Sequence, residues 1–405
     1  MKAAIITNWA RIRSIGKIAW GLREQLIGNG DSVKLFYGRK DPSAENIDGV
    51  IRFCSDADIK FNGVCARVFG AEGFYSKGPT KQLIKALDDF KPDVIYLVIL
   101  HGYYLNFPML FDYMGKNNIK VIYLMLDEYA FLGKCPYSFE CNMFQTECNK
   151  CPQIKEYPKS IFFDRSKDIF YAKKEAYGKI KDLTFVGIEY TVQQAKLSAL
   201  MKDAKYAVMD EAVDLRNIYF PRNTAGLREK LGIPKNAKIV VTVAPFSNPR
   251  KGCRYYLESA RKLEYRKDIY FVHVGFDGDK DICPSNYIPI SYVSNQDELA
   301  EYYSLADLFV CTSLAETIPA SCLEALSCGS PLLGFMISGM PTCSDAEHGA
   351  FVEACNVEAM VNVLKDIKQK DQKVIDSCRK YAESRYDAIE YRKKLVALAK
   401  RKCEE

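Results

Sequence analysis

Apolar runs alternate with helix-like stretches along this chain, and the alternation occurs twice. The first series has short runs rich in β-branched residues at 2–7, 32–37, 94–100 and 120–124. The second series has similar runs at 237–244, 269–276, 307–312 and 331–334. Such runs, separated by amphipathic segments, are typical of buried parallel strands joined by helices. The sequence therefore predicts two doubly wound α/β domains, each with a ligand crevice at the carboxyl ends of its strands.

Length and charge agree with two domains. A chain of 405 residues is long for a single core. The predicted division is a first domain at 1–214, a second at 215–385 and a terminal helix at 386–405. The formal charge of +6, from 57 basic and 51 acidic residues, is too small to indicate a nucleic-acid partner. No apolar run is long enough for a signal peptide or a spanning helix, which indicates a cytoplasmic protein.

Two carboxylates lie eight residues apart where a strand passes into a helix. Glu316 follows the run 307–312, and Glu324 falls one turn inside a helix predicted at 320–328, with Pro319 at its first position. The first N–H groups of a helix suit a diphosphate, and carboxylates beside them can accept hydrogen bonds from sugar hydroxyls. The alternative is an ordinary helix-start glutamate near a loop glutamate.

The sequence around these two carboxylates resembles a known binding-site signature. Glu-x7-Glu, then Ala-Leu-x-Cys-Gly-x-Pro and Ser-Gly-Met-Pro at 338–341, closely resembles the donor site of retaining glycosyltransferases of family 4. In the first half, the segments 101–106, 135–152 and 157–166 are similar to a subgroup that builds bacterial surface polysaccharides of the colanic-acid type. The resemblance implies a GT-B fold: two Rossmann-like domains facing across a cleft, with the C-terminal helix crossing back to the first.

The resemblance also implies roles for single residues. Glu316 would hold the transferred sugar and Glu324 the ribose, while Lys251, helped by Arg250, would neutralise the diphosphate leaving group. The rest of the implied donor-binding set is Gly16, Tyr292, Val293, Thr317, Pro319, Ala320 and Ser321. Transfer with retention needs no side-chain nucleophile. None of the motifs that carry the resemblance is the metal-chelating Asp-x-Asp motif of metal-dependent transferases, so we expect transfer without a divalent cation.

Two prolines depart from the family pattern. Pro245 stands where many members carry an arginine. Stabilisation of the negatively charged leaving group would therefore depend on Lys251, Arg250 and the start of the helix. Pro319 replaces a glycine and removes an N–H group that would face the sugar, although Ala320 and Ser321 still supply amides. The geometry or the identity of the donor is therefore expected to differ.

A third departure concerns a histidine. Relatives place a His-Asp pair after a strand of the first domain, whereas this chain has Leu126 before Asp127. Three explanations remain open: Asp127 or Glu128 takes the role, His101 takes it from the neighbouring strand end, or turnover is weak. His101 also has a purely structural interpretation, as a core histidine with satisfied hydrogen bonds.

Four cysteines lie within seventeen residues of polar, turn-prone sequence: Cys135, Cys141, Cys148 and Cys151. Close spacing in a cytosolic protein favours a tetrahedral structural zinc ion over disulfides, and free thiols are the third interpretation. The cluster would hold a loop near the acceptor side of the protein.

The sequence thus predicts a hexosyltransferase that uses a UDP- or GDP-sugar and a glycan acceptor, lipid-linked, in surface polysaccharide synthesis. A non-catalytic GT-B module that binds another transferase, and a sugar-nucleotide epimerase, are the alternatives. Basic residues beside Leu395, Val396 and Leu398 offer two interpretations of the last helix. Either it rests on anionic lipid at the inner face of the membrane, or, as we favour, it is docked with its charges in water.

Overall fold

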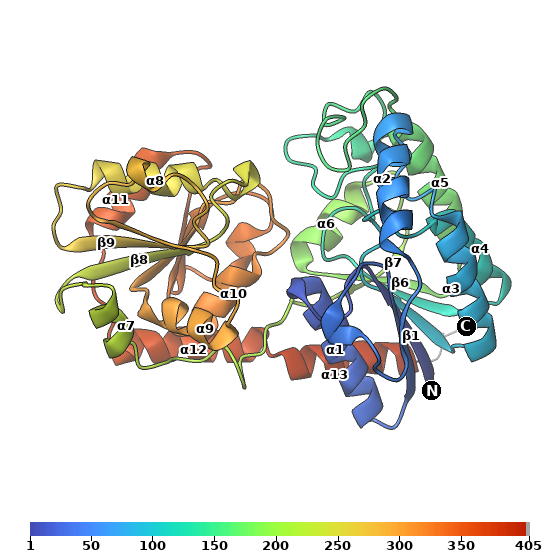
Figure 1. Cartoon of the computed structure of the whole chain (residues 1–405), viewed down its shortest axis with the longest axis horizontal. Helices are drawn as coiled ribbons and strands as arrows, with labels where there is room; N and C mark the ends of the chain where they lie inside the picture. Colours follow the sequence, from blue (N-terminus) through green and yellow to red (C-terminus); the bar gives the residue numbers. More distant parts are fainter. Residues whose placement is uncertain (402–405) are drawn as a thin grey trace. The chain divides into compact units, whose positions relative to one another are not determined.

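The computed structural model describes residues 1–401 and divides the chain into two compact units (Figure 1). The N-terminal unit consists of Met1–Met209 and the chain from Ile389 onward, and the C-terminal unit is Asp210–Ala388. These divisions lie a few residues from the expected ones at 214 and 385. The last four residues of the expected terminal helix, 402–405, lie outside the described part of the chain.

Local pairing explains why the C-terminal unit begins at residue 210. Both Asp210 oxygens accept hydrogen bonds from the guanidinium of Arg385, at 2.8 and 3.0 Å. A short parallel bridge also joins Val213 to Asp387. The segment after the last strand of the first sheet is therefore held by the end of the second unit.

The N-terminal unit is built on a seven-stranded parallel sheet in the order β3-β2-β1-β4-β5-β6-β7. Its strands are β1 (Lys2–Thr7), β2 (Ser32–Tyr37), β3 (Val50–Arg52), β4 (Val94–Leu97), β5 (Lys120–Leu124), β6 (Leu183–Gly187) and β7 (Lys205–Val208). Its helices are α1 (Arg13–Gly28), α2 (Asp56–Phe69), α3 (Lys77–Phe90), α4 (Phe107–Lys116), α5 (Ser166–Gly178), α6 (Glu189–Leu197) and most of α13 (Ala388–Lys400).

The C-terminal unit has a six-stranded parallel sheet in the order β10-β9-β8-β11-β12-β13. Its strands are β8 (Lys238–Val243), β9 (Ile269–Val274), β10 (Tyr287–Ile290), β11 (Leu308–Cys311), β12 (Leu332–Phe335) and β13 (Gly349–Val352). Its helices are α7 (Ala225–Lys230), α8 (Cys253–Lys262), α9 (Gln296–Leu305), α10 (Ala320–Ser327), α11 (Val357–Lys365) and α12 (Gln372–Arg385).

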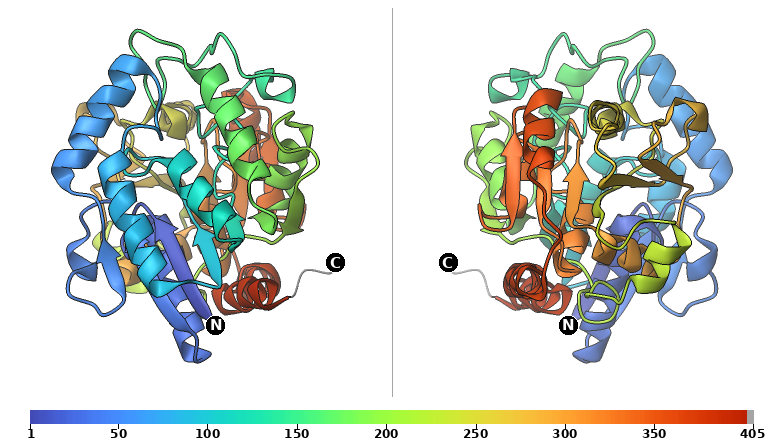
Figure 2. Two further views of the ribbon diagram at one scale, coloured as in Figure 1. Left: turned by 90° about the vertical axis from the view of Figure 1, so that its right-hand side faces the viewer. Right: turned by 90° about the vertical axis from the view of Figure 1, so that its left-hand side faces the viewer.

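Both sheets reverse their strand order at one point, between β1 and β4 in the first unit and between β8 and β11 in the second. Figure 2 gives two further views of the strands and the helices. In such sheets the connections on the two sides of the reversal run to opposite faces and leave a crevice at the carboxyl ends of the strands. All four residues of β4 are buried, as expected for a parallel strand covered on both faces. The sequence-predicted runs at these central strands are confirmed.

Helix α13 packs on the N-terminal unit, as the resemblance implied. Leu395, Val396 and Leu398 are buried there, and the Tyr96 hydroxyl donates to the Leu395 carbonyl at 3.4 Å. An ion pair of 3.3 Å between Lys400 and Asp31 fixes its end. Of the two interpretations of this helix, the docked one is confirmed, because the apolar side chains that would have met lipid are in the core.

His273 shows how tightly the second sheet is packed. It lies fully buried in β9, with Nδ1 2.5 Å from the Tyr287 hydroxyl and Nε2 2.8 Å from the carbonyl of Ala244. Burial lowers the pKa of His273 from about 6.5 to about 4. The unfolded chain therefore binds a proton between these pH values that the folded chain does not.

We expect the free energy of unfolding to fall as the pH drops from about 6.5 to about 4, by up to about 3 kcal/mol from His273. The substitution His273→Gln keeps a donor and an acceptor and should flatten this decline. Chemical denaturation at several pH values measures it. His348→Gln, in the same unit, should leave the decline in place, and an equally steep decline in the His273 variant would refute the assignment.

Candidate active site

The loop after β8 presents two cations at the point of strand-order reversal. Its last turn, the 3-10 helix η3 (Pro249–Lys251), is capped by the side chain of Asn248, which accepts from Arg250 N at 3.1 Å. Gly252 then has φ +62°, and a Cβ atom there would lie 2.0 Å from the Thr312 carbonyl oxygen. Only glycine allows this approach, so the loop bearing Arg250 and Lys251 is held against the end of β11.

Glu316, in the loop after β11, binds both cations. Its Oε1 accepts from Lys251 Nζ at 2.6 Å and from Arg250 Nη1 at 2.7 Å. Burial alone would raise the pKa of the Glu316 carboxyl, but the charges of Lys251 and Arg250 lower it below its usual value. The carboxylate is ionised, and the structure brings together three residues predicted from widely separated motifs.

A small cavity lies beside this cluster at the start of α10. It is lined by backbone and side chains from the ends of β8 and β11 and by the helix start, including Ala244, Lys251, Thr312, Ser313 and Ser321. Pro319 is the N-cap of α10, one position before its predicted place, and it gives the helix no side-chain cap. Ala320 and Ser321 form the first turn, where amide groups suit an anion.

Glu324 lies one turn further along α10 and is engaged by tyrosine. Its Oε2 accepts from the Tyr303 hydroxyl of α9 at 2.6 Å. Burial first, and then the charge of Glu324, raise the pKa of Tyr303 well above its ordinary value, so this tyrosine remains a donor. The contact was not expected from the sequence. The ribose-binding role of Glu324 stays a prediction.

Three further residues that are predicted to bind the sugar donor lie in loops of the same unit. Tyr292 is almost fully exposed and Val293 half-buried, in the loop after β10, and Thr317 is buried directly after Glu316. Because all these loops leave the carboxyl ends of parallel strands, they share one edge of the sheet. Their contacts with a donor remain predictions.

Gly16 lies in the first turn of α1, which begins at Arg13. A Cβ atom at Gly16 would lie 2.9 Å from backbone atoms of Arg11, so a glycine is required where the loop after β1 folds over the helix. This packing explains Gly16 without a ligand, and its donor role stays a prediction.

In the N-terminal unit, the ends of β4 and β5 carry a histidine–aspartate pair. His101 Nε2 lies 2.7 Å from Asp127 Oδ2, and His101 Nδ1 lies 3.0 Å from the Tyr157 hydroxyl. Asp127 also accepts from the backbone N–H of Tyr129 at 3.0 Å, which fixes its orientation. His101 thus contacts the aspartate that follows the expected histidine position, Leu126. Two of the candidates left open, His101 and Asp127, therefore contact each other, and which of them takes the role stays a prediction.

Glu128, the other candidate beside Leu126, makes hydrogen bonds that hold a neighbouring loop. Its carboxylate is buried, accepts from Ser138 N at 2.5 Å and from the Tyr190 hydroxyl at 3.0 Å, and does not contact His101. Burial raises its pKa above the usual value. Glu128 therefore anchors the cysteine-containing loop, and the adjacent Asp127 alone faces the histidine.

A residue missed by the sequence reasoning, Glu72, lies beneath this pair. It is buried and accepts from the backbone N–H groups of Gly102 and Tyr103, at 2.9 and 3.0 Å. The Tyr129 hydroxyl donates to its other oxygen at 3.0 Å. Glu72 therefore sets the backbone directly after His101. A glutamate after the Gly-Ala pair at 70–71 has no sequence signature that would have revealed this.

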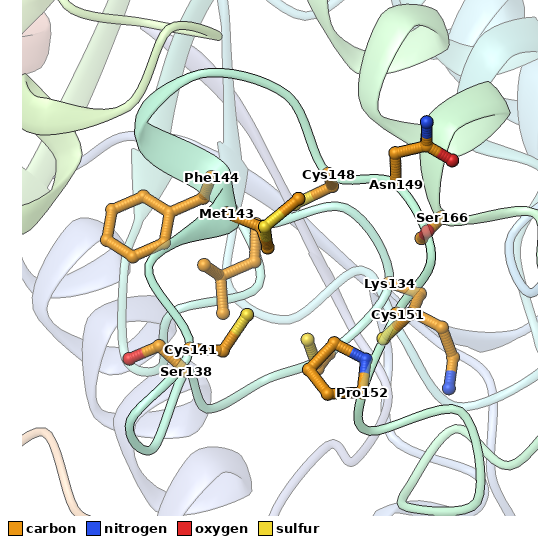
Figure 3. Close-up of a pocket in the computed structure, with 12 residues that line it drawn as sticks. Lys134, Ser138, Cys141, Met143, Phe144, Cys148, Asn149, Cys151, Pro152 and Ser166 are labelled. Atoms are coloured by element: carbon orange, nitrogen blue, oxygen red, sulfur yellow. The ribbon is translucent and has the colours of Figure 1, made fainter.

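The four cysteines line one small cavity, shown in Figure 3. All are free thiols. The Cys135 thiol donates to the sulfur of Cys151, which lowers the pKa of Cys151 to about 7 and raises that of Cys135. Cys148 Sγ accepts from the backbone N–H of Gly133 at 3.2 Å. None of the four cysteines is in a disulfide in the structure, and all four line the same cavity. The choice among zinc, disulfides and free thiols stays a prediction.

Whether this cluster holds zinc stays a prediction. Within residues 1–401, no group of three or more cysteine, histidine or acidic side chains is already placed as a metal-binding set. Side-chain rotation would be needed to bring the sulfurs into tetrahedral contact with an ion. The loop is otherwise held by the buried Lys173, whose Nζ donates to the carbonyls of Tyr129 and Leu132.

The fold and the residues of the C-terminal site can be compared with those of known proteins. The architecture is the GT-B fold, two Rossmann-like parallel sheets, and it matches HepE of Anabaena, solved with UDP, at a TM-score of 0.71 and 12% identity over 98% of this chain and 99% of that one. Residues 237–369 match the family described as glycosyl transferases group 1, and this stretch contains Lys251, Glu316 and Glu324. This stretch of the C-terminal unit is therefore similar to group 1 glycosyl transferases.

Two curated relatives extend the likeness. A putative colanic acid biosynthesis glycosyl transferase, WcaC of Escherichia coli, is 20% identical over 304 residues, covering 73% of this chain and 72% of that protein. A UDP-Gal:alpha-D-GlcNAc-diphosphoundecaprenol alpha-1,3-galactosyltransferase of Escherichia coli is 27% identical over 189 residues, or 42% and 47% of the two chains. Among residues 1–401, no helix is long and apolar enough to cross a membrane.

The zinc interpretation of the cysteine cluster is directly testable. We expect about one zinc ion per chain in protein purified without chelators, since four thiolates satisfy a tetrahedral ion. The substitution Cys148→Ser should remove it, whereas Cys355→Ser, at an exposed cysteine outside the cluster, should not. Elemental analysis of the metal content gives the answer. If the protein contains no metal and all four cluster thiols react with a thiol reagent after unfolding, the zinc interpretation is wrong and the cysteines are free thiols.

Proposed function

We propose that the protein is a retaining glycosyltransferase that transfers a hexose from a nucleoside diphosphate sugar to a lipid-linked glycan during bacterial surface polysaccharide synthesis. The observation that carries the proposal is the buried Glu316 carboxylate bound by Lys251 and Arg250 beside the start of α10. This arrangement supplies positive charge and free amides where a diphosphate would lie, with a carboxylate to bind sugar hydroxyls.

The two cations have a defined task in such a transfer. As the bond between the sugar and the diphosphate breaks, negative charge grows on the leaving phosphate, and cations held in place beforehand stabilise it without reorganisation. Lys251 and Arg250 are held in this way by η3 and by Glu316. We propose that they supply the charge that a divalent cation supplies in metal-dependent transferases.

The acceptor and the nucleotide base of the donor are proposed from the names of similar proteins. The matched galactosyltransferase is named for a UDP-sugar and a diphosphoundecaprenol acceptor, and HepE was solved with UDP. These names favour a UDP-sugar and a lipid-linked acceptor for this chain, and the likeness to WcaC favours an extracellular polysaccharide as the product.

In the N-terminal unit we propose that His101 and Asp127 act on the reacting groups together. Asp127 accepts a hydrogen bond from one ring nitrogen and fixes the tautomer, while Tyr157 contacts the other. A histidine oriented in this way can donate to a sugar hydroxyl or accept a proton from one. His101 would replace the histidine that Leu126 displaces.

Donor binding is the first test. Lys251→Ala should weaken UDP binding at least about tenfold, because a charge-assisted contact to phosphate is lost. Arg250 still pairs with Glu316 in that variant, so the fold should persist. The matched control is Lys262→Ala, whose lysine pairs with Glu358 on the surface of the same unit. Calorimetric titration with UDP and GDP, without added metal, measures both variants.

Failure of the wild-type protein to bind either nucleotide would contradict the proposal and favour a non-catalytic module. Binding with equal affinity in the Lys251 variant would show that the diphosphate lies elsewhere.

The histidine–aspartate pair gives a second test. Asp127→Asn should slow the release of UDP from a UDP-hexose about tenfold to hundredfold, because the tautomer of His101 is no longer fixed. UDP affinity should not change. The control is Asp345→Asn, since Asp345 contacts His348 at 2.6 Å in an aspartate–histidine pair away from the site. A full rate in the Asp127 variant would assign the pair to structure alone.

A further inference from the structure

Helix α2 carries three exposed large apolar side chains, Phe61, Val64 and Phe69. Its buried residues are Asn62, Gly63 and Ala66, which are polar or small. Phe61 is 67% exposed, and Val64, one turn along, is also exposed. A surface helix normally turns its large apolar residues toward the core. Packing on this protein therefore does not explain the outward face of α2.

A second apolar segment lies beside the end of this helix. Ile161, Phe162 and Phe163 are consecutive and exposed, and Phe162 is 69% exposed. The Ile161 N–H donates to the Arg67 carbonyl at 2.7 Å, and the rings of Phe163 and Phe69 are stacked with centroids 6.4 Å apart. The segment is thus attached to the C-terminal end of the helix. We call the exposed apolar side chains of the helix and the segment the α2 apolar surface: Phe61, Val64, Phe69, Ile161, Phe162 and Phe163.

Basic side chains are interleaved with it. Lys60 and Arg67 are exposed on α2, and Lys159 and Arg165 are exposed on either side of the apolar segment. The acidic residues of the helix are confined to its first turn, where Asp58 closes a capping box with Ser55. Figure 1 shows α2 on the outside of the N-terminal unit, with no other element of that unit covering it.

We infer that the α2 apolar surface docks on an anionic lipid bilayer, with its aromatic rings among the acyl chains and its basic groups at the headgroups. Exposed Phe and aliphatic side chains bordered by Lys and Arg are the composition that binds membrane interfaces. Long basic side chains bury their stems and keep the charge at the surface. The core of a protein–protein interface is depleted of lysine, which makes lipid the better fit.

Docking would also bring the histidine–aspartate pair toward the membrane. Tyr157, whose hydroxyl contacts His101, lies four residues before Ile161 on the same loop. A lipid-linked acceptor reaches the protein from a bilayer, so this placement fits the proposed function. The inference does not rest on it, because lipid binding is measured without donor or acceptor.

The test uses the full chain and sedimentation with vesicles of phosphatidylcholine alone or mixed with phosphatidylglycerol. Wild-type protein should bind the mixed vesicles, and more weakly at high salt. The double substitution Phe61→Ser with Phe162→Ser should lower the partition coefficient at least about tenfold. Tyr265→Ser is the matched control, since Tyr265 is 65% exposed in the C-terminal unit, and it should leave binding unchanged.

Charge-reversal variants separate the electrostatic contribution to lipid binding from the apolar one. Lys60→Glu with Lys159→Glu should weaken binding to the mixed vesicles and change binding to neutral vesicles little. No vesicle binding by the wild type, or equal binding by the double serine variant, would overturn the inference. Dimerisation that light scattering detects in the wild type and that the serine substitutions abolish would assign the surface to a second copy, and would also overturn it.

Discussion

The second unit depends on one charged contact, the Glu316 carboxylate between Lys251 and Arg250. A buried carboxylate without partners would be strongly destabilising, and two cations in one short turn would repel each other. Bound together, they join the loop after β8 to the loop after β11, the strands on either side of the strand-order reversal. The close approach of Gly252 to Thr312 fixes the same junction from the backbone. The site is therefore held together by contacts within the protein itself.

Sequence reasoning could predict this site because it depends on central strands. Those strands are long apolar runs, and their carboxyl ends must meet wherever a parallel sheet reverses its order. The same rule accounts for His101 and Asp127, which end adjacent strands and lie 26 positions apart. What sequence could not predict was the choice between Asp127 and Glu128. Successive residues leaving a strand point in opposite directions, and only the register shows which one meets the histidine.

Other features escaped prediction for different physical reasons. Strands β3 and β13 are short and half-buried, so their apolar pattern is weak. The start of α1 has a serine and a glycine after two arginines, which favours a loop locally although packing makes it helical. The contacts of Glu72 and Tyr303 join residues remote in sequence with no shared motif. The outward apolar face of α2 was missed because a helical apolar pattern does not show which side is buried.

The same contact also sets what a diphosphate ligand of the proposed donor site must do. The charges of Lys251 and Arg250 are compensated by Glu316. A diphosphate must therefore share these cations with a carboxylate that stays ionised, since their charges hold its pKa below the usual value. A nucleoside diphosphate without its sugar has only repulsion from Glu316, whereas a sugar conjugate can hydrogen-bond to that carboxylate. In the proposed transfer, the intact donor would therefore bind better than the spent nucleotide, which would promote product release.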